Sequence, residues 1–159
     1  MALDDLVKLA KNKVAGTRVL GFDLGTKTIG LALSDPGLTV ASPIQTLRRR
    51  KFSKDVIILQ DLVDERNIGA FVFGLPSNMD GSEGPRAQGT RDFAANLVSH
   101  IKLPIAFWDE RLSTAAVERL MIDEADLSRK KRAQSVDMMA AAYILQGALD
   151  ALATNQGTA

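Results

Sequence analysis

Residues 18–36, RVLGFDLGTKTIGLALSDP, decide the fold of this chain. They contain two apolar segments of strand length, 18–24 and 29–33, on either side of a Gly-Thr-Lys-Thr turn. A second turn, Ser-Asp-Pro-Gly, leads into a weaker strand predicted over 38–47. Pro43 cannot donate a ladder hydrogen bond, which favours an edge position for this third strand. Strands joined by such tight turns run antiparallel to their neighbours.

Beyond residue 52 the pattern changes to alternating helices and strands. The apolar spacing predicts helices over 53–66, 86–101, 113–122 and 128–152, with short strands over 70–73 and 105–108. Right-handed crossover connections would add these two strands in parallel to the hairpins. The sequence therefore predicts an α/β fold, a mixed five-stranded sheet of three antiparallel and two parallel strands with helices on both faces.

The two ends of the chain lie outside this predicted domain, which spans residues 17–152. Residues 1–16 form an extension whose apolar residues are spaced for a short amphipathic helix, and 153–159 predict a flexible tail. The extension could pair two chains or pack within one, so both a monomer and a homodimer stay open. We expect no membrane-spanning stretch and no signal peptide, hence a cytoplasmic protein without a membrane partner.

The composition limits the chemistry that the chain can perform. The 159 residues include no cysteine and one histidine, His100, which excludes thiolate metal sites, cysteine nucleophiles and multi-histidine metal sites. The charges nearly cancel, with 20 Lys and Arg against 19 Asp and Glu, so bulk charge does not predict nucleic-acid binding but a local basic face can. Carboxylates are the only side chains left to hold a catalytic metal.

Three carboxylates are candidates for such a site. Asp23 lies within an apolar strand, where a buried carboxylate is costly unless it has a partner, and Gly21 and Gly25 predict open space beside it. Glu110 ends the last predicted strand, at the edge where the sites of α/β sheets usually lie. Asp137 lies early in the last helix, on a face of small residues that can approach the sheet.

Each of the three also has an alternative interpretation. Asp23 could cap a turn, Glu110 could pair with Arg111 or cap the next helix, and Asp137 could face solvent near a helix start. If the sheet forms as predicted, however, the three approach one another and need a cation. Oxygen ligands suit Mg²⁺ or Mn²⁺, and two such ions can hold a phosphodiester and activate water for in-line displacement.

At these residues the sequence resembles the YqgF/RuvX family of ribonuclease-H-like nucleases. The resemblance runs from about residue 18 to 150 and is carried by GFDLGTKTIGLALSD (21–35), FGLPSNMDGSEGPRA (73–87), WDERLSTAAVE (108–118) and SVDMMAAAYILQ (135–146). It implies a ribonuclease-H-like fold and divalent-metal-dependent phosphodiester hydrolysis, with the family's acidic positions at Asp23, Glu110 and Asp137. It also implies maturation of the 5′ end of pre-16S rRNA, with Holliday junction cleavage as the rival activity.

Basic and polar residues near the three acids predict contacts with the phosphates of pre-rRNA or branched DNA, in ribosomal particles where the substrate is rRNA. Basic runs occupy 48–51 and 129–132, and the second opposes the dipole at the start of the last helix. The glycine-rich loop 74–84 precedes a helix start that could receive a phosphate. The candidate substrate-binding residues are Thr26, Lys27, Asn78, Arg86, Arg91, Arg129 and Lys130. Solvated charged surfaces and ordinary turn chemistry are the alternatives.

Two further functions stay open from the sequence. A non-catalytic nucleic-acid-binding module would use the basic runs alone, although the complete set of acids argues against it. The segment DLGTKT is also typical of actin-like ATP-binding proteins, but the chain is too short for their two lobes. Trp108 and Tyr143 are the only Trp and Tyr in the chain, and we expect Trp108 to belong to the core and not to stack on bases.

Overall fold

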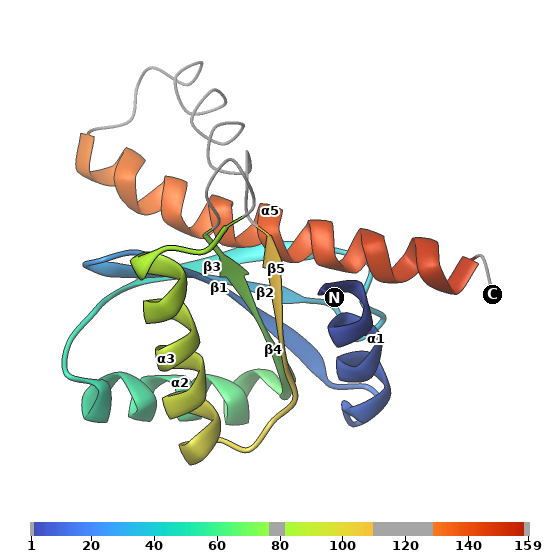
Figure 1. The fold of residues 1–159 in the computed structure, drawn as a ribbon. Helices are drawn as coiled ribbons and strands as arrows, with labels where there is room; N and C mark the ends of the chain where they lie inside the picture. Colours follow the sequence, from blue (N-terminus) through green and yellow to red (C-terminus); the bar gives the residue numbers. More distant parts are fainter. Residues whose placement is uncertain (1, 77–81, 110–128, 158–159) are drawn as a thin grey trace.

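The computed structural model describes residues 2–76, 82–109 and 129–157, and its centre is a five-stranded mixed sheet (Figure 1). The strand order is β3-β2-β1-β4-β5. The strands are β1 (Arg18–Leu24), β2 (Thr28–Ser34), β3 (Ala41–Arg48), β4 (Ile68–Leu75) and β5 (Ile105–Asp109). The helices are α1 (Ala2–Asn12), α2 (Phe52–Arg66), α3 (Pro85–His100) and α5 (Arg129–Gly157).

Strand pairing confirms the predicted topology. β1 pairs with β2, and β2 with β3, in antiparallel fashion, while β1 pairs with β4 and β4 with β5 in parallel. β3 is an edge strand, as Pro43 predicts. The register shifts beside it, since Leu31 faces Gln45 while Ala32 faces Pro43, which leaves Ile44 as an extra residue in the edge strand.

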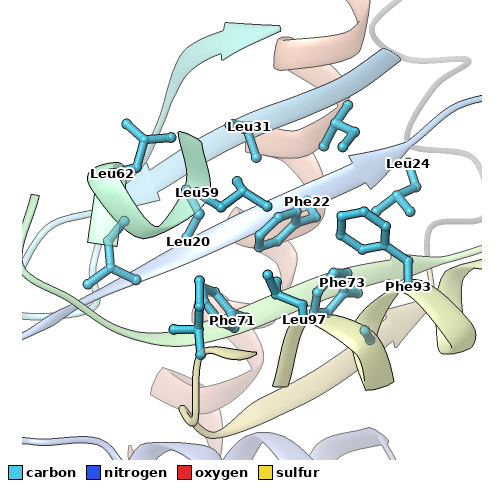
Figure 2. Packing of buried hydrophobic residues seen from close by; sticks show 14 of the residues in the cluster. Leu20, Phe22, Leu24, Leu31, Leu59, Leu62, Phe71, Phe73, Phe93 and Leu97 are labelled. Atoms are coloured by element: carbon cyan, nitrogen blue, oxygen red, sulfur yellow. The ribbon is translucent and has the colours of Figure 1, made fainter. Parts of the chain in front are cut away.

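The two faces of the sheet carry different cores. On the side covered by α2 and α3, alternate residues of β1 and β4 supply large side chains, and Figure 2 shows their rings gathered with Phe93 of α3. Phe22 stacks on Phe73 with ring centroids 4.4 Å apart and meets Phe71 edge-on at 5.5 Å. This face holds the larger apolar side chains, and each large side chain contributes more hydrophobic stabilisation when buried.

The opposite face is built from small residues and carries α1 and α5. Ala70, Ala106 and Ala141 are fully or almost fully buried there. A Cβ at Gly21 would lie 2.9 Å from the Cβ of Leu145, so α5 packs directly on the backbone of β1. The prediction of open space beside Asp23 is therefore wrong at Gly21, because the missing side chain makes room for the helix.

Trp108 joins this small-residue core, as expected from the sequence. Its side chain is partly buried and packs against the α5-side cluster. Its Nε1 would lie 3.0 Å from a Cβ at Gly147, so this glycine lets α5 pass close to β5.

The extension before β1 packs within the chain. Leu6 and Leu9 of α1 are buried in the same cluster as Ala148, Leu149 and Leu152 of α5. Of the two roles left open for the amphipathic start, packing within the chain is the one that the structure describes.

Helix α5 is longer than predicted. It continues to Gly157, into the segment expected as a tail, because no proline or glycine interrupts it after Gly147, and the Thr154 hydroxyl donates to the Asp150 carbonyl at 3.0 Å.

The segment Val136–Thr154 has a mean hydropathy of 1.2, enough in length and composition for a membrane span, contrary to our expectation. Its apolar residues include Ile144 and Leu145, which are buried in the fold, and Leu145 packs on Gly21 of β1, which accounts for this hydropathy. The predicted helix 113–122 lies outside the described residues.

Candidate active site

Asp23 lies where the sequence predicts it, on the central strand of the sheet. It is half-buried, and its side chain belongs to the α5 face, since Leu20, Phe22 and Leu24 pack on the other face. In the β1–β2 register Asp23 is directly opposite Gly30. Directly opposite residues of an antiparallel pair project to the same side of the sheet, so the space above Gly30 lies beside the Asp23 carboxylate.

Asp137 of α5 is held in this space beside Asp23. A Cβ at Gly30 would overlap the carbonyl oxygen of Asp137, so only glycine lets the helix backbone come this close to β2. The Thr28 hydroxyl donates a hydrogen bond of 2.6 Å to Asp137 Oδ2. Thr28 and Gly30 lie two residues apart in β2 and therefore share a face. The structure thus brings Asp137 to the same patch as Asp23, and the alternative of a solvent-facing Asp137 is wrong.

Glu110, the third predicted acid, lies outside the described residues. It follows Asp109, the last residue of β5, which is in register with Leu75 at the end of β4. Because β1, β4 and β5 are parallel, their carboxyl ends share one edge of the sheet. Within the part of the chain that the structure describes, no three Asp, Glu or His side chains form a metal-binding group.

Two of the predicted substrate-binding residues line a pocket at this same edge. The pocket has a volume of about 270 Å³ and lies between the end of β1 and the first turns of α3. Thr26 and Arg86 line it, and both are exposed. Lys27 is exposed in the β1–β2 turn, where its carbonyl accepts a hydrogen bond from the Arg49 amide at 2.8 Å. The other lining residues are Leu24, Gly25, Arg49, Pro85, Gly89 and Thr90.

Arg91 lies apart from these pocket residues. Its guanidinium forms a two-pronged ion pair with Glu83, with N–O distances of 2.8 and 2.9 Å, and lies 4.7 Å from the Phe107 ring centroid. The hydrogen bonds of this pair raise the pKa of Arg91 and lower the pKa of Glu83. A phosphate would have to compete with Glu83 for this side chain.

The remaining predicted contacts lie beyond what the structure describes. Asn78 belongs to the segment 77–81, and the side chains of Arg129 and Lys130 are not described although α5 begins at Arg129. His100 lies at the other end of α3, where its ring packs against Phe52 at 5.4 Å between centroids. This contact fits the structural role expected for it.

The sequence did not single out Thr28 or Arg49. Thr28 looks like an ordinary turn residue, and only the position of α5 turns its hydroxyl into a partner for Asp137. Arg49 belongs to the basic run 48–51, which was predicted to contact phosphates as a whole. Its Nη1 donates to the Gly25 carbonyl at 2.8 Å, and the β2–β3 register decides which arginine of the run does so.

Comparison with known proteins decides the family. The RuvX model, described as Holliday junction resolvase, matches residues 17–151. This chain belongs to the RuvX family. It is therefore a nuclease by class, a hydrolase that acts on phosphodiester bonds, as the sequence predicts.

Relatives and solved structures agree with this assignment. A Rhodobacter capsulatus protein named "Putative pre-16S rRNA nuclease" is 64% identical over 84% of this chain and 83% of its own length. A Roseobacter denitrificans protein of the same name is 55% identical over 94% of this chain and 93% of its own.

The solved structures confirm the ribonuclease-H-like fold. T. thermophilus RuvC in complex with a Holliday junction matches with a TM-score of 0.53 at 13% identity, over 90% of this chain and 98% of that one. The yeast mitochondrial Holliday junction resolvase matches with a TM-score of 0.56 at 12% identity, over 98% and 86%.

Proposed function

We propose that this RuvX-family protein is a divalent-metal-dependent nuclease that cleaves pre-16S rRNA during maturation of its 5′ end. The observation that carries the catalytic part is the convergence of Asp23 and Asp137 on one patch of the sheet, which Gly30 permits and the Thr28 hydrogen bond fixes. The substrate part is supported by the names of two relatives, of which the alignment covers 83% and 93%.

The described residues at this patch fit a hard divalent cation. They offer carboxylate oxygens, which Mg²⁺ and Mn²⁺ prefer. Two half-buried carboxylates on one patch also repel each other, and a cation between them removes that repulsion. We propose that Asp23, Asp137 and Glu110 hold two such ions, Mg²⁺ or Mn²⁺. When bound, the metal supplies Lewis-acid stabilisation and a water of lowered pKa.

The protein's own side chains orient the metal-binding carboxylates and supply positive charge for the substrate phosphates. Thr28 holds one oxygen of Asp137, which orients the carboxylate before any ligand arrives. Thr26, Lys27 and Arg86 lie at the same edge of the sheet and can contact backbone phosphates. We include Asn78, Arg91, Arg129 and Lys130 as further contacts on the strength of the sequence alone. A cytoplasmic location and an association with ribosomal particles also belong to this proposal.

The test is a panel of substrates offered to the purified protein with Mg²⁺ or Mn²⁺. Pre-16S rRNA, four-way DNA junctions and single strands are compared for the wild type, Asp23→Asn and Asp137→Asn. We expect both variants to lose at least about 100-fold in cleavage rate while their circular dichroism spectra are unchanged. Asp150→Asn, on the same helix as Asp137 but exposed, is the matched control and should cleave normally.

Three outcomes separate the candidate functions. Metal-dependent cleavage that persists in Asp23→Asn would disprove the assignment of the site. Preference for four-way junctions over pre-16S rRNA would favour Holliday junction resolution, the activity in the family's description. Nucleic-acid binding without cleavage under every metal and substrate would identify a non-catalytic binding module.

A further inference from the structure

The pocket between β1 and α3 lies at the same end of β1 as Asp23. It opens on the α2/α3 face of the sheet, whereas Asp23 and Asp137, the proposed catalytic patch, lie on the α5 face. Leu24, which lines it, directly follows Asp23 and points to the opposite face. The pocket is therefore reached from the end of β1 and lies about 7 Å along the chain from Asp23, counting two residues to Gly25. A strand of nucleic acid that crosses the end of β1 would pass both places.

Arg49 is fixed at the wall of this pocket by three contacts. Its Nη1 donates to the Gly25 carbonyl at 2.8 Å, and its backbone amide donates to the Lys27 carbonyl at 2.8 Å. Its guanidinium carbon lies 5.6 Å from the centroid of the Phe93 ring. None of these contacts neutralises the charge, and among the described residues no carboxylate forms an ion pair with Arg49. These contacts thus hold the Arg49 guanidinium in place at a cost in side-chain entropy, and no carboxylate of the described residues pairs with it.

A second arginine faces the same space from α3. Arg86 lines the pocket in the first turn of this helix, where a cation opposes the helix dipole. The turn contains no acidic residue, and Gly84 provides no side-chain cap. Thr90 is buried at the start of the next turn, and its hydroxyl donates a hydrogen bond to the Arg86 carbonyl at 3.1 Å. Two arginines and two threonines line the pocket among apolar and glycine residues, and none of the described lining residues is acidic, which gives it the character of an anion site.

The size of the pocket favours a single chemical group over a whole ligand. Its volume of about 270 Å³ is below the range of about 300–1,000 Å³ that is usual for sites of complete small molecules. A phosphate with part of its sugar would fill it. Because the pocket begins within two residues of Asp23 in the chain, a phosphate bound there would belong to a nucleotide close to the scissile bond.

We propose that this pocket binds a non-scissile backbone phosphate of the RNA substrate, with Arg49 as its principal ligand and Arg86 as the second. The inference rests on the proposed nuclease function and adds a subsite to it. Arg49 touches substrate but not the reacting phosphate, so its contribution is to binding and to the alignment of the strand over Asp23.

Binding is measured in EDTA, because an arginine–phosphate contact needs no metal and no cleavage should then occur. The probe is a fluorescently labelled single-stranded RNA that covers the 5′ cleavage region of pre-16S rRNA. We expect Arg49→Gln to raise Kd about tenfold and to reduce the slope of log K against log salt by about 0.7, the value for one lost phosphate contact on a single strand. Arg66→Gln, the same change at an exposed arginine ending α2, should leave both values unchanged.

Gly89 offers a second test that does not touch either arginine. It lines the pocket, and among the described residues a Cβ there would meet no atom within 4 Å apart from its chain neighbours and its own helix backbone. Side chains at this exposed helical position are therefore tolerated, and Glu, Gln and Lys all have better helix propensity than Gly. We expect Gly89→Glu to bind the RNA most weakly, Gly89→Gln to be intermediate and Gly89→Lys to bind at least as tightly as the wild type. This order would show that charge at the pocket governs binding.

The results separate this subsite from the nuclease function. Wild-type Kd and salt slope in Arg49→Gln, or equal binding by all the Gly89 variants, would overturn the subsite even if the wild type cleaves RNA with Mg²⁺ or Mn²⁺. So would an absence of measurable RNA binding by the wild type. Conversely, if the wild type never cleaves but the variants bind in the expected order, the nuclease proposal fails and the subsite stands. Thermal melts confirm that each variant is folded.

Discussion

The two faces of the sheet use opposite means to hold their helices. Under α2 and α3, the rings of Phe22, Phe71 and Phe73 fill the space between sheet and helix (Figure 2). Under α5, Gly21 and Gly30 remove side chains so that the helix lies against the strand backbone. The first arrangement buries large aromatic side chains, and the second buries smaller side chains but places one backbone very accurately over another.

This difference explains why the carboxylates gather on the small-residue face. A helix separated from the sheet by aromatic rings could not bring Asp137 to the strand that carries Asp23. Where glycine lets the backbones touch, a short side chain such as Asp reaches the sheet directly. The aromatic face thus contributes mainly to the stability of the fold, and the α5 face positions Asp137 beside Asp23.

The largest effect on stability is expected on the aromatic face. Phe71→Ala should lower the free energy of unfolding by about 3–5 kcal/mol, because Phe71 is fully buried and its removal leaves a cavity. The rate of cleavage at 20 °C by the folded protein should change less than twofold. Urea denaturation and a cleavage assay measure the two quantities, and Phe71→Leu gives a milder variant if Phe71→Ala does not fold. A large loss of activity in folded Phe71→Leu would show that the two faces are not separate in function.

The next effect concerns the glycines under α5. Gly30→Ala sets a Cβ against the backbone of Asp137, which cannot move without shifting the helix, so we expect a loss of about 2–3 kcal/mol and at least about tenfold slower cleavage. Gly21→Ala is the matched variant, because its Cβ would lie 2.9 Å from the Leu145 Cβ, so α5 must shift there as well but by much less than at Gly30. It should cost about 1 kcal/mol and leave cleavage nearly unchanged. Equal activity losses in the two variants would contradict a special role for the approach at Gly30.

A smaller change is expected when the Thr28 hydroxyl is removed. Thr28→Val keeps the shape of the side chain but cannot donate to Asp137 Oδ2, so cleavage should slow by about tenfold and require more Mg²⁺ for half-maximal rate. Thr28→Ser retains the hydroxyl and should restore most of the rate and the metal requirement. If Val and Ser variants titrate alike with Mg²⁺, the hydroxyl does not position the carboxylate.

The smallest effect is expected at a turn remote from the proposed site. Hydrogen bonds from the Thr39 hydroxyl and from the Val40 and Thr39 amides lower the pKa of Asp35 from 3.8 to about 2. Since the folded-state pKa is depressed, this carboxylate contributes stability above about pH 4 and loses the contribution as the pH falls toward 2. Asp35→Asn should therefore flatten the decline of melting temperature between pH 4 and 2 and leave cleavage at neutral pH unchanged.

Much of the fold follows from residue patterns that act locally. The hairpins between 18 and 47, the crossover units and the edge position of the strand with Pro43 are all confirmed, because turn chemistry and strand alternation depend on near neighbours. The meaning of Gly21 could not be read in this way. A glycine beside a carboxylate fits both an open space and a close helix, and only the contact with Leu145 decides between them.

The sequence also predicted some residues of the candidate site and missed others. Asp23 and Asp137 stand out as acids in apolar surroundings, and the structure brings them to one patch. Thr28 and Arg49 gain their roles from contacts with residues 109 and 24 positions away in the chain, which no local pattern encodes. The assignment of Glu110 stays a prediction from the sequence and the family.

The contact between α1 and the far end of α5 has a mechanical consequence. Leu6 and Leu9 clamp the helix near Ala148 and Leu152, whereas Asp137 lies some ten residues earlier, about 15 Å along the axis from Gly147. A tilt of about 10° about the Gly147 contact would displace Asp137 by about 2.5 Å, enough to break its bond to Thr28. Leu6 and Leu9 of α1, although remote from Asp23 and Asp137, thus hold the short arm of a lever whose long arm carries Asp137, a proposed metal ligand.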